Sequence, residues 1–510
     1  MGRSPLIGLS PSFVLFAILS GHAQAQSPLA CFSGTDTTSR IAACTAALES
    51  GGFPDDTAAL LHETRGALLL DQGRTTEAIN DLDIAVQMSP DDPPALAMRG
   101  KAYASLQKVT MAEADFSKAI ALDPNLVEAY LGRGDILLKI NRVDAAMADL
   151  GTAARLDPRN PGPYRVRGAN FVAQQKYGDA IPELERAIAL DPRDAESWHV
   201  LGIAQLRNGN AARAAEAFSE TLAQRPGQID VLRQRATAYG QLEQFEKAVT
   251  DYSAVLDAAP DNPPIRQARG VAALRAGRFA MAVDDFTIAL DTTPNDPELL
   301  FFRGMARIND AKCKDAIDDF TEVLRILPGN IDALASRGMA HECRTDYTSA
   351  AEDFSAALSH GPNAELSEKR AEMRFLTGDW RGAAKDFADA KTADAAVWRF
   401  LAQSRANMDG RSDLIAATQE FGERHWPGAA YKFFLGESSS DAVLAAAVEG
   451  GDPAKNALRL CQANVWLGLA ASLLGERDRA LAHFSDALSP GDFCAFERRI
   501  AGQELNRDKR

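Results

Sequence analysis

Apolar, small and polar positions recur along the chain with a period of 34 residues. A proline, numbered here as position 32 of each repeat, marks the period at Pro90, Pro124, Pro158, Pro192, Pro226, Pro260, Pro294, Pro328 and Pro362. Over these nine repeats position 8 is glycine in all but one, position 20 is always alanine, and position 24 is always leucine, phenylalanine or tyrosine. A fixed period of this length predicts a stacked array of repeats.

The pattern of small and aromatic positions resembles the tetratricopeptide repeat (TPR), in which every repeat is a pair of antiparallel helices, A and B. The resemblance covers residues 59–395 and includes a tenth repeat, one residue shorter, that is marked by Ala383 and Phe387. It implies an all-α fold, a right-handed superhelical solenoid of about ten repeats. We expect each position-32 proline to follow a helix B and end it, because proline has no N–H for the next helical bond.

The start of the chain has the features of a secretory signal peptide over residues 1–25. Arg3 supplies a positive charge, residues 13–19 form a short apolar run, and Ala23-Gln24-Ala25 is a cleavage site. Because Cys31 lies well past this site, lipidation is disfavoured. Residues 26–58 are then an N-terminal cap segment, in which residues 37–50 have apolar side chains at helical spacing.

The last part of the chain, residues 396–510, departs from the strict period. It ends with one more repeat-like helix pair, in which Gly468, Ala480 and Phe484 keep the spacing. This part resembles the C-terminal half of the NlpI-type periplasmic TPR lipoproteins, through two aromatic-Leu-Gly motifs (434–436 and 466–468) and a closing Glu-x-x-x-Ala-x-x-Glu-Leu (497–505). The resemblance implies an envelope adaptor that brings a protease and cell-wall hydrolases together. Unlike those proteins, this chain has no lipidation motif and carries a longer array.

A formal net charge of −15 argues against nucleic acid and against an anionic membrane surface as partners, since both attract basic faces. The charge also suits an ordinary soluble protein. No segment after the signal peptide is long and apolar enough to suggest a membrane span.

Six cysteines in an exported chain suggest disulfides. Their places in the repeats favour three local pairs, because the members of each pair fall at the same edge of the array or in one end segment. The expected pairs are Cys31–Cys44, Cys313–Cys343 and Cys461–Cys494. A metal site is the weaker alternative, since no two cysteines have C-x-x-C spacing.

No motif for catalysis or for a cofactor stands out. The chain has no glycine-rich phosphate loop, no H-E-x-x-H and no G-x-S-x-G. His341 next to Cys343 falls where this type of repeat packs an aromatic side chain against helix B, so we interpret it as a packing residue. We therefore expect a protein that is not an enzyme and has no cofactor.

Arginine at position 7 and an acid at position 23 recur together, sixteen residues apart. The one repeat without the arginine, at Leu201, is also the one without the acid, at Ala217. We predict that each arginine of helix A pairs with the acid of helix B in its own repeat. The nine pairs are Arg65–Asp81, Arg99–Asp115, Arg133–Asp149, Arg167–Glu183, Arg235–Asp251, Arg269–Asp285, Arg303–Asp319, Arg337–Asp353 and Arg370–Asp386.

The concave face of such solenoids usually binds extended peptides through positions 2, 5, 9, 12 and 13 of helix A. Repeats 7 to 9 place apolar residues there, with Arg275 beside them. These residues are Val271, Leu274, Phe301, Met305, Ile308 and Met339. Two interpretations stay open: an adaptable binding groove, or packing between neighbouring helices.

The function that these features favour is a non-enzymatic periplasmic scaffold or adaptor that binds proteins or peptides of the cell envelope. The alternative is a structural or assembly factor of an envelope machine, such as one for polysaccharide export. Whether the chain forms a homodimer stays open.

Overall fold

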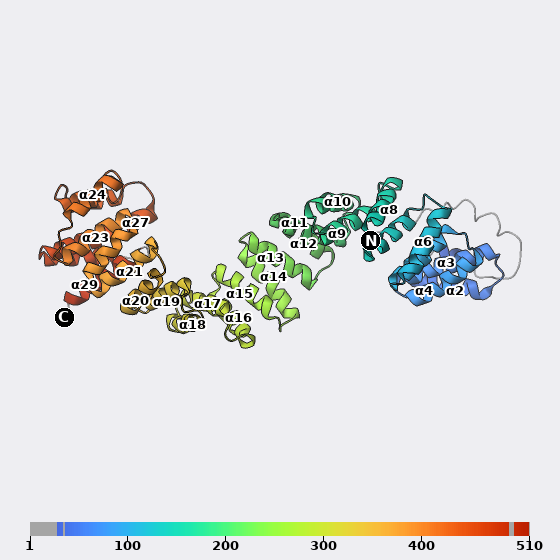
Figure 1. Ribbon diagram of the computed structural model, residues 1–510, viewed down its shortest axis with the longest axis horizontal. Coiled ribbons are helices and arrows are strands. Elements are labelled where there is room, and N and C mark those ends of the chain that lie inside the picture. The colour runs from blue at the N-terminus through green and yellow to red at the C-terminus, as the bar shows by residue number, and fades with distance from the viewer. Residues whose placement is uncertain (1–27, 34–35, 489–493, 509–510) are drawn as a thin grey trace. The chain divides into compact units, whose positions relative to one another are not determined.

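A computed structural model describes residues 28–33, 36–488 and 494–508 of the protein (Figure 1). The described residues form 29 helices and no strand, so the predicted all-α fold class is confirmed. The predicted signal peptide, residues 1–25, lies outside the described residues. None of the described helices is both long and apolar enough to cross a membrane.

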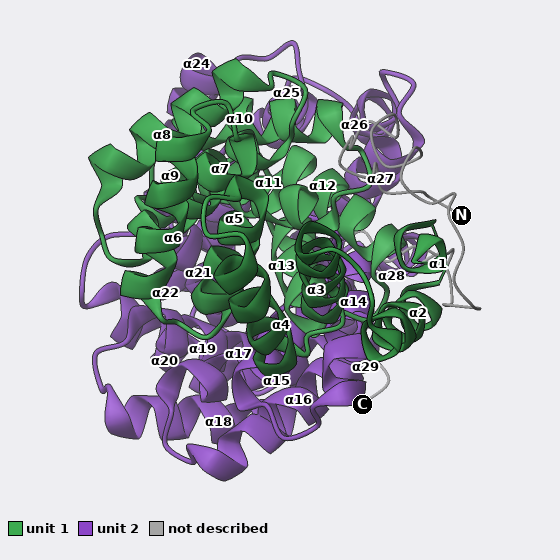
Figure 2. Ribbon diagram, turned by 90° about the vertical axis from the view of Figure 1, so that its right-hand side faces the viewer, with its two compact units in different colours: residues 1–242 green, residues 243–510 purple. Residues whose placement is uncertain are grey.

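The chain divides into two compact units, residues 1–242 and 243–510, which we call the N-terminal unit and the C-terminal unit (Figure 2). The helices of the N-terminal unit are α1 (Leu29–Ser33), α2 (Thr37–Ser50), α3 (Asp55–Asp71), α4 (Thr75–Met88), α5 (Pro93–Ser105), α6 (Val109–Leu122), α7 (Val127–Lys139), α8 (Val143–Leu156), α9 (Gly162–Ala173), α10 (Tyr177–Leu190), α11 (Ala195–Arg207), α12 (Ala211–Gln224) and α13 (Ile229–Gln241).

The C-terminal unit continues the repeats and adds the C-terminal part of the chain. Its helices are α14 (Phe245–Ala258), α15 (Pro263–Arg275), α16 (Phe279–Thr292), α17 (Pro297–Asn309), α18 (Cys313–Ile326), α19 (Ile331–Cys343), α20 (Tyr347–Leu358), α21 (Ala364–Thr377), α22 (Trp380–Ala390), α23 (Ala393–Arg405), α24 (Arg411–Phe421), α25 (Gly428–Leu435), α26 (Ser440–Ala447), α27 (Pro453–Leu473), α28 (Arg477–Ala487) and α29 (Ala495–Asp508).

The small residue at position 8 makes room for the large residue at position 24. A β-carbon added to Gly100 on α5 would lie 3.0 Å from a ring carbon of Phe116 on α6. The same ring faces Gly132 of the next repeat, where an added β-carbon would lie at 2.4 Å. The ring at position 24 therefore fills the space above the glycine of its own repeat and also meets the next repeat.

The turns between repeats follow from their Asp-Pro sequences. Helix α6 ends at Leu122, and the carboxylate of Asp123 then accepts a hydrogen bond from the backbone N–H of Asn125 across Pro124. At the corresponding turn two repeats later, Asp194 caps α11 by accepting a hydrogen bond from the backbone N–H of Glu196. The prolines therefore follow the ends of the B helices, as predicted, and the neighbouring aspartates hold the turns and cap the next helix.

Arginine–acid pairs join helix A to helix B within a repeat, as predicted. Eight of the nine expected pairs are present, and seven of them have closest N–O distances of 2.6–2.8 Å. The acids are almost fully covered; Asp285 and Asp386 have side chains 1% and 0% exposed. The ninth expected pair, Arg235 with Asp251, would span the boundary between the two units and stays a prediction.

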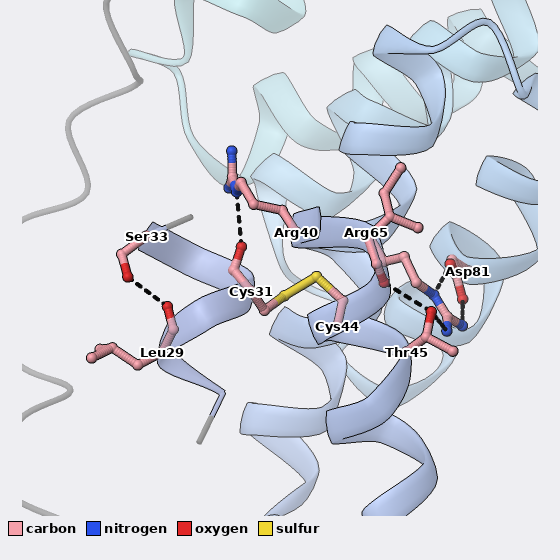
Figure 3. Close-up of a disulfide and its surroundings, with 9 residues drawn as sticks. Leu29, Cys31, Ser33, Arg40, Cys44, Thr45, Arg65 and Asp81 are labelled. Carbon is pink, nitrogen blue, oxygen red and sulfur yellow. Dashed lines mark hydrogen bonds and ion pairs between the residues drawn. A yellow bond between two sulfur atoms is a disulfide. The ribbon is translucent and has the colours of Figure 1, made fainter. Parts of the chain in front are cut away.

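Three disulfides join the expected cysteines, so the predicted pairing is confirmed. Cys31 on α1 is bonded to Cys44 on α2, and this bond holds the cap helices together (Figure 3). Cys313–Cys343 links repeats 8 and 9, and Cys461–Cys494 links α27 to the residue before α29. Each bond lies within one compact unit.

Aromatic side chains fill the core of the C-terminal part. Trp398 on α23 lies at the centre, with its ring centroid 4.7 Å from that of Phe496 and 6.2 Å from that of Trp466. The ring of Phe375, from repeat 10, meets Trp398 edge-on at 5.4 Å. Residues from repeat 10, α23, α27 and α29 thus share one core, which fixes α29 against the end of the repeat array.

Candidate protein-binding surface

Three A helices of the C-terminal unit, α15, α17 and α19, place the predicted apolar residues on neighbouring helices. We call these six residues the apolar stripe. Val271 and Leu274 lie on α15, Phe301, Met305 and Ile308 lie on α17, and Met339 lies on α19.

The apolar stripe is partly buried and partly open. Phe301 packs edge-on against Phe320 of helix B at 5.7 Å, and Met305 and Ile308 contact the same core cluster. Met339 is 37% exposed, whereas the other five residues are half-buried. The two sequence interpretations therefore describe two faces of the same side chains: one side packs against helix B, and the other faces solvent.

The charged side chains near the apolar stripe differ in how they are held. Arg303 and Arg307 on α17 both bind the carboxylate of Asp319. Arg275, at the end of α15, is exposed and lies 5.2 Å above the ring of Phe245, with no carboxylate at ion-pair distance among the described residues. Arg275 is thus an exposed arginine that directly follows Leu274 of the stripe and has no carboxylate partner among the described residues.

The C-terminal helix α29 contacts the repeats next to the apolar stripe. Arg499 forms an ion pair with Glu342, at the end of α19, and its guanidinium lies 5.9 Å above the ring of Tyr347. Glu342 is three residues from Met339 of the apolar stripe, so this contact of α29 lies on the same helix as the end of the stripe. Sequence patterns did not indicate this contact, because Glu342 and Arg499 lie 157 residues apart.

Buried carboxyl groups gather where α29 meets repeat 10. The pKa of Glu372 on α21 is raised to about 7: burial is the main cause, Lys369 opposes the shift, and the nearby Glu342 and Glu497 add to it. Burial also raises the pKa of Glu497 on α29 and of Asp394 on α23. Gln462 donates a hydrogen bond to Asp394 at 3.1 Å. The contact of α29 with repeat 10 therefore includes one carboxyl group, that of Glu372, whose pKa lies near 7.

His341 has the packing role that its position suggested. Its ring nitrogens lie 3.4 Å from Asp346 and 3.8 Å from Asp353, the acid that Arg337 binds. Within the described residues no three His, Cys, Asp or Glu side chains are grouped so that they could hold a metal ion.

Similar proteins agree with the repeat architecture. The family model for the tetratricopeptide repeat matches residues 63–127, 97–161, 166–229, 233–297, 267–331 and 336–397, which is more than half of the chain. No curated protein matches the sequence.

Several solved structures resemble parts of the chain. YrrB, described as a TPR protein with an unusual peptide-binding site, is 23% identical over 39% of this chain and 97% of its own, with a TM-score of 0.32. MamA is 26% identical over 31% of this chain and 92% of its own, with a TM-score of 0.29. The Pseudomonas aeruginosa protein pilF is 19% identical over 41% and 96%, with a TM-score of 0.36.

Proteins built from this repeat are in general non-enzymatic scaffolds that bind proteins or peptides. The family model, the helix pairs and the recurring glycine, alanine, aromatic and proline positions all lead to the same conclusion: this chain belongs to the tetratricopeptide repeat family.

Proposed function

We propose that the protein is a non-enzymatic periplasmic scaffold or adaptor that binds proteins or peptides of the cell envelope. The predicted signal peptide supports an exported protein. Three disulfides that use all six cysteines suit an oxidising compartment. The resemblance of residues 396–510 to NlpI-type lipoproteins supports a role in the envelope.

The apolar stripe is the observation that carries the binding proposal. Half-buried Phe301 and Met305 are held against Phe320 and so are fixed in place before a partner arrives. Preordered aromatic and flexible apolar side chains are suited to an extended apolar segment. Arg275 would meet an acidic side chain or the terminal carboxylate of that segment.

Substitution of Met339 tests the stripe with little effect on packing, because this side chain is 37% exposed. We expect Met339→Lys to weaken partner capture from an envelope extract about tenfold, since a charge would be placed in an apolar contact. Met111→Lys is the matched control, because Met111 is 45% exposed on α6 in the N-terminal unit. Equal capture by both variants would move the binding surface away from the stripe.

The double variant Phe301→Ala, Met305→Ala separates binding from stability. A folded variant that no longer captures its partner supports the groove. A variant that melts early and still captures its partner shows that the stripe is core, and the C-terminal part of the chain becomes the candidate surface. The captured proteins also separate the two functions: hydrolases or proteases favour the adaptor, and membrane export components favour the assembly factor.

A further inference from the structure

A second set of contacts made by the position-7 arginines joins most repeats to the one before them. Nη1 of these arginines donates to position 25 of the preceding helix B, while in Arg133, for example, Nε and Nη2 hold the acid of the same repeat. The cap has the same bond, shown in Figure 3, where Arg65 reaches both Thr45 on α2 and Asp81 on α4. The bonds are Arg65–Thr45 (3.0 Å), Arg99–Asp83 (3.0 Å), Arg133–Ser117 (3.1 Å), Arg235–Ser219 (3.1 Å), Arg269–Ser253 (3.1 Å), Arg303–Thr287 (3.4 Å), Arg337–Thr321 (3.2 Å) and Arg370–Ser355 (3.2 Å).

The two joints on either side of repeat 4, residues 161–194, lack this bond. Position 25 of repeat 3 is Gly151, which has no side chain to accept a bond from Arg167. Repeat 5 has Leu201 in place of the arginine, so Glu185 at position 25 of repeat 4 receives no bond from position 7. Glu185 is instead paired at 3.5 Å with Arg213 on α12, and both of these side chains are exposed. Eight joints have the bond, and the two without it are consecutive.

The arginine–acid pair of repeat 4 is also incomplete. Arg167 binds Glu183 through Nη2, but its buried Nε and the buried Oε2 of Glu183 have no hydrogen-bond partner. Glutamate is one methylene longer than the aspartate of the other repeats, so the two-point contact is lost. Other side-chain contacts at these joints are weak or exposed. Asn170 donates to the sulfur of Met147 at 3.7 Å across the first joint. Across the second joint Arg165 pairs with Glu196 at 2.9 Å, and Gln224 donates to the carbonyl oxygen of Pro192 at 3.2 Å, all at the surface.

Open pockets lie beside the same two joints. One of about 340 Å³ is lined by α7, α9 and the start of α11, and one of about 660 Å³ is lined by α10, α11, α12 and the end of α13. Repeat 4 thus lacks the buried arginine bond on both sides, and an open pocket lies beside each of its two joints.

We propose that the superhelix bends more easily at the two interfaces of repeat 4, within the N-terminal unit, than at the other interfaces between its repeats. A solenoid repeat contacts only its neighbours, so a joint that lacks its bridging bond weakens one interface and leaves the others unchanged. Such a joint would let the helix A face of the N-terminal unit adapt to partners of different curvature. The proposal is independent of the apolar stripe, which lies in the C-terminal unit.

A hydroxyl group introduced at position 151 tests whether the missing hydrogen bond to Arg167 weakens the interface between repeats 3 and 4. A β-carbon at Gly151 meets no atom within 4 Å, so Gly151→Ser fits and offers Arg167 the acceptor that Ser117 offers Arg133. Gly151→Ala is the control at the same site, because alanine is the better helix former but has no hydroxyl. We expect serine to slow hydrogen exchange of the α8 and α9 amides about 2- to 10-fold relative to alanine. Equal exchange rates in the serine and alanine variants would show that the missing hydrogen bond is not what weakens this interface.

Distance measurements test the bending itself. Spin labels at position 29 of repeats 2 and 5 (Ala121 and Ala223) span the two unbridged joints. Labels at the same position of repeats 6 and 9 (Asp257 and Ser359) span three bridged joints, and all four sites are exposed. We expect a broader distance distribution for the first pair, and Gly151→Ser should narrow it. If the two label pairs gave distance distributions of equal width in the unsubstituted chain, the proposal that the array bends more easily at repeat 4 would be wrong.

Discussion

The position-7 arginine joins three helices with one guanidinium group. In repeat 3, Arg133 on α7 binds both oxygens of Asp149 on α8 and donates its third group to Ser117 on α6. The hydrogen bonds with Asp149 are the main cause of the raised pKa of Arg133. Lysine could replace the charge but not this geometry, because an ammonium group has no planar fork that matches a carboxylate.

We expect Arg133→Ala to destabilise repeat 3 by about 3 kcal/mol, because the nearly buried Asp149 would lose its partner. Arg133→Lys should recover only part of this loss. The measurement is hydrogen exchange of the α7 and α8 amides in the full chain. The exposed pair Arg74–Glu77 provides the control, and Arg74→Ala should leave exchange unchanged. A similar effect of both alanine variants would contradict the role of burial.

At the scale of elements, the helix pairs were predictable because each depends on residues close in sequence. Gly100 and Phe116, or Arg133 and Asp149, lie sixteen residues apart and repeat with the period. The contact of Arg499 with Glu342 could not be predicted in this way, because it depends on how α23 to α28 return the chain to repeat 9. The burial of the apolar stripe could not be predicted for a related reason. Phe301 touches both helix B and solvent, and sequence spacing alone does not tell how much of a side chain packs against helix B and how much is exposed.

The docking of α29 should depend on pH through Glu372. Glu342, Glu497, Lys369 and Glu372 itself are the charged groups that interact there. The folded-state pKa of about 7 lies above the ordinary value of 4.5, so between these two pH values only the folded state keeps the proton. Stability of the C-terminal unit should therefore fall as pH rises from about 4.5 to about 7, by about 3 kcal/mol in total, and then level off.

Glu372→Gln checks this dependence. The variant should have a flatter stability profile between pH 4.5 and 7 and should be more stable than the unsubstituted chain at pH 8. Glu365→Gln on the same helix is the matched control, because Glu365 is exposed. Thermal melts across this pH range are the measurement. A profile for Glu372→Gln that follows the unsubstituted chain would show that the carboxyl group does not couple docking to pH.

At the scale of the whole molecule, stability is a sum of local terms, and the disulfides act on separate parts of it. Cys31–Cys44 closes the cap, Cys313–Cys343 joins two repeats beside the apolar stripe, and Cys461–Cys494 anchors the start of α29. No disulfide links one compact unit to the other, since these three pairs use all six cysteines.

We expect Cys461→Ser, Cys494→Ser to lower the stability of the C-terminal unit by about 3 kcal/mol and to leave the N-terminal unit unchanged, because the bond restricts only its own loop. Cys31→Ser, Cys44→Ser should lower the stability of the N-terminal unit and leave the C-terminal unit unchanged. Hydrogen exchange resolved by helix distinguishes the two. Loss of protection throughout the chain in either variant would mean that the units unfold together.

The interchangeable arginine contacts have a consequence for how such a chain changes length during evolution. Removing residues 263–296, one full period, would bring Arg303 to Ser253, the acceptor that Arg269 uses now. A duplicated period would likewise arrive with its own arginine, acid and acceptor. Gene segments that encode whole repeats can thus be gained or lost in most of the array without a new interface. Duplication of repeat 3 or repeat 5 is different, because it would copy Gly151 or Leu201 and add another interface without the arginine bond.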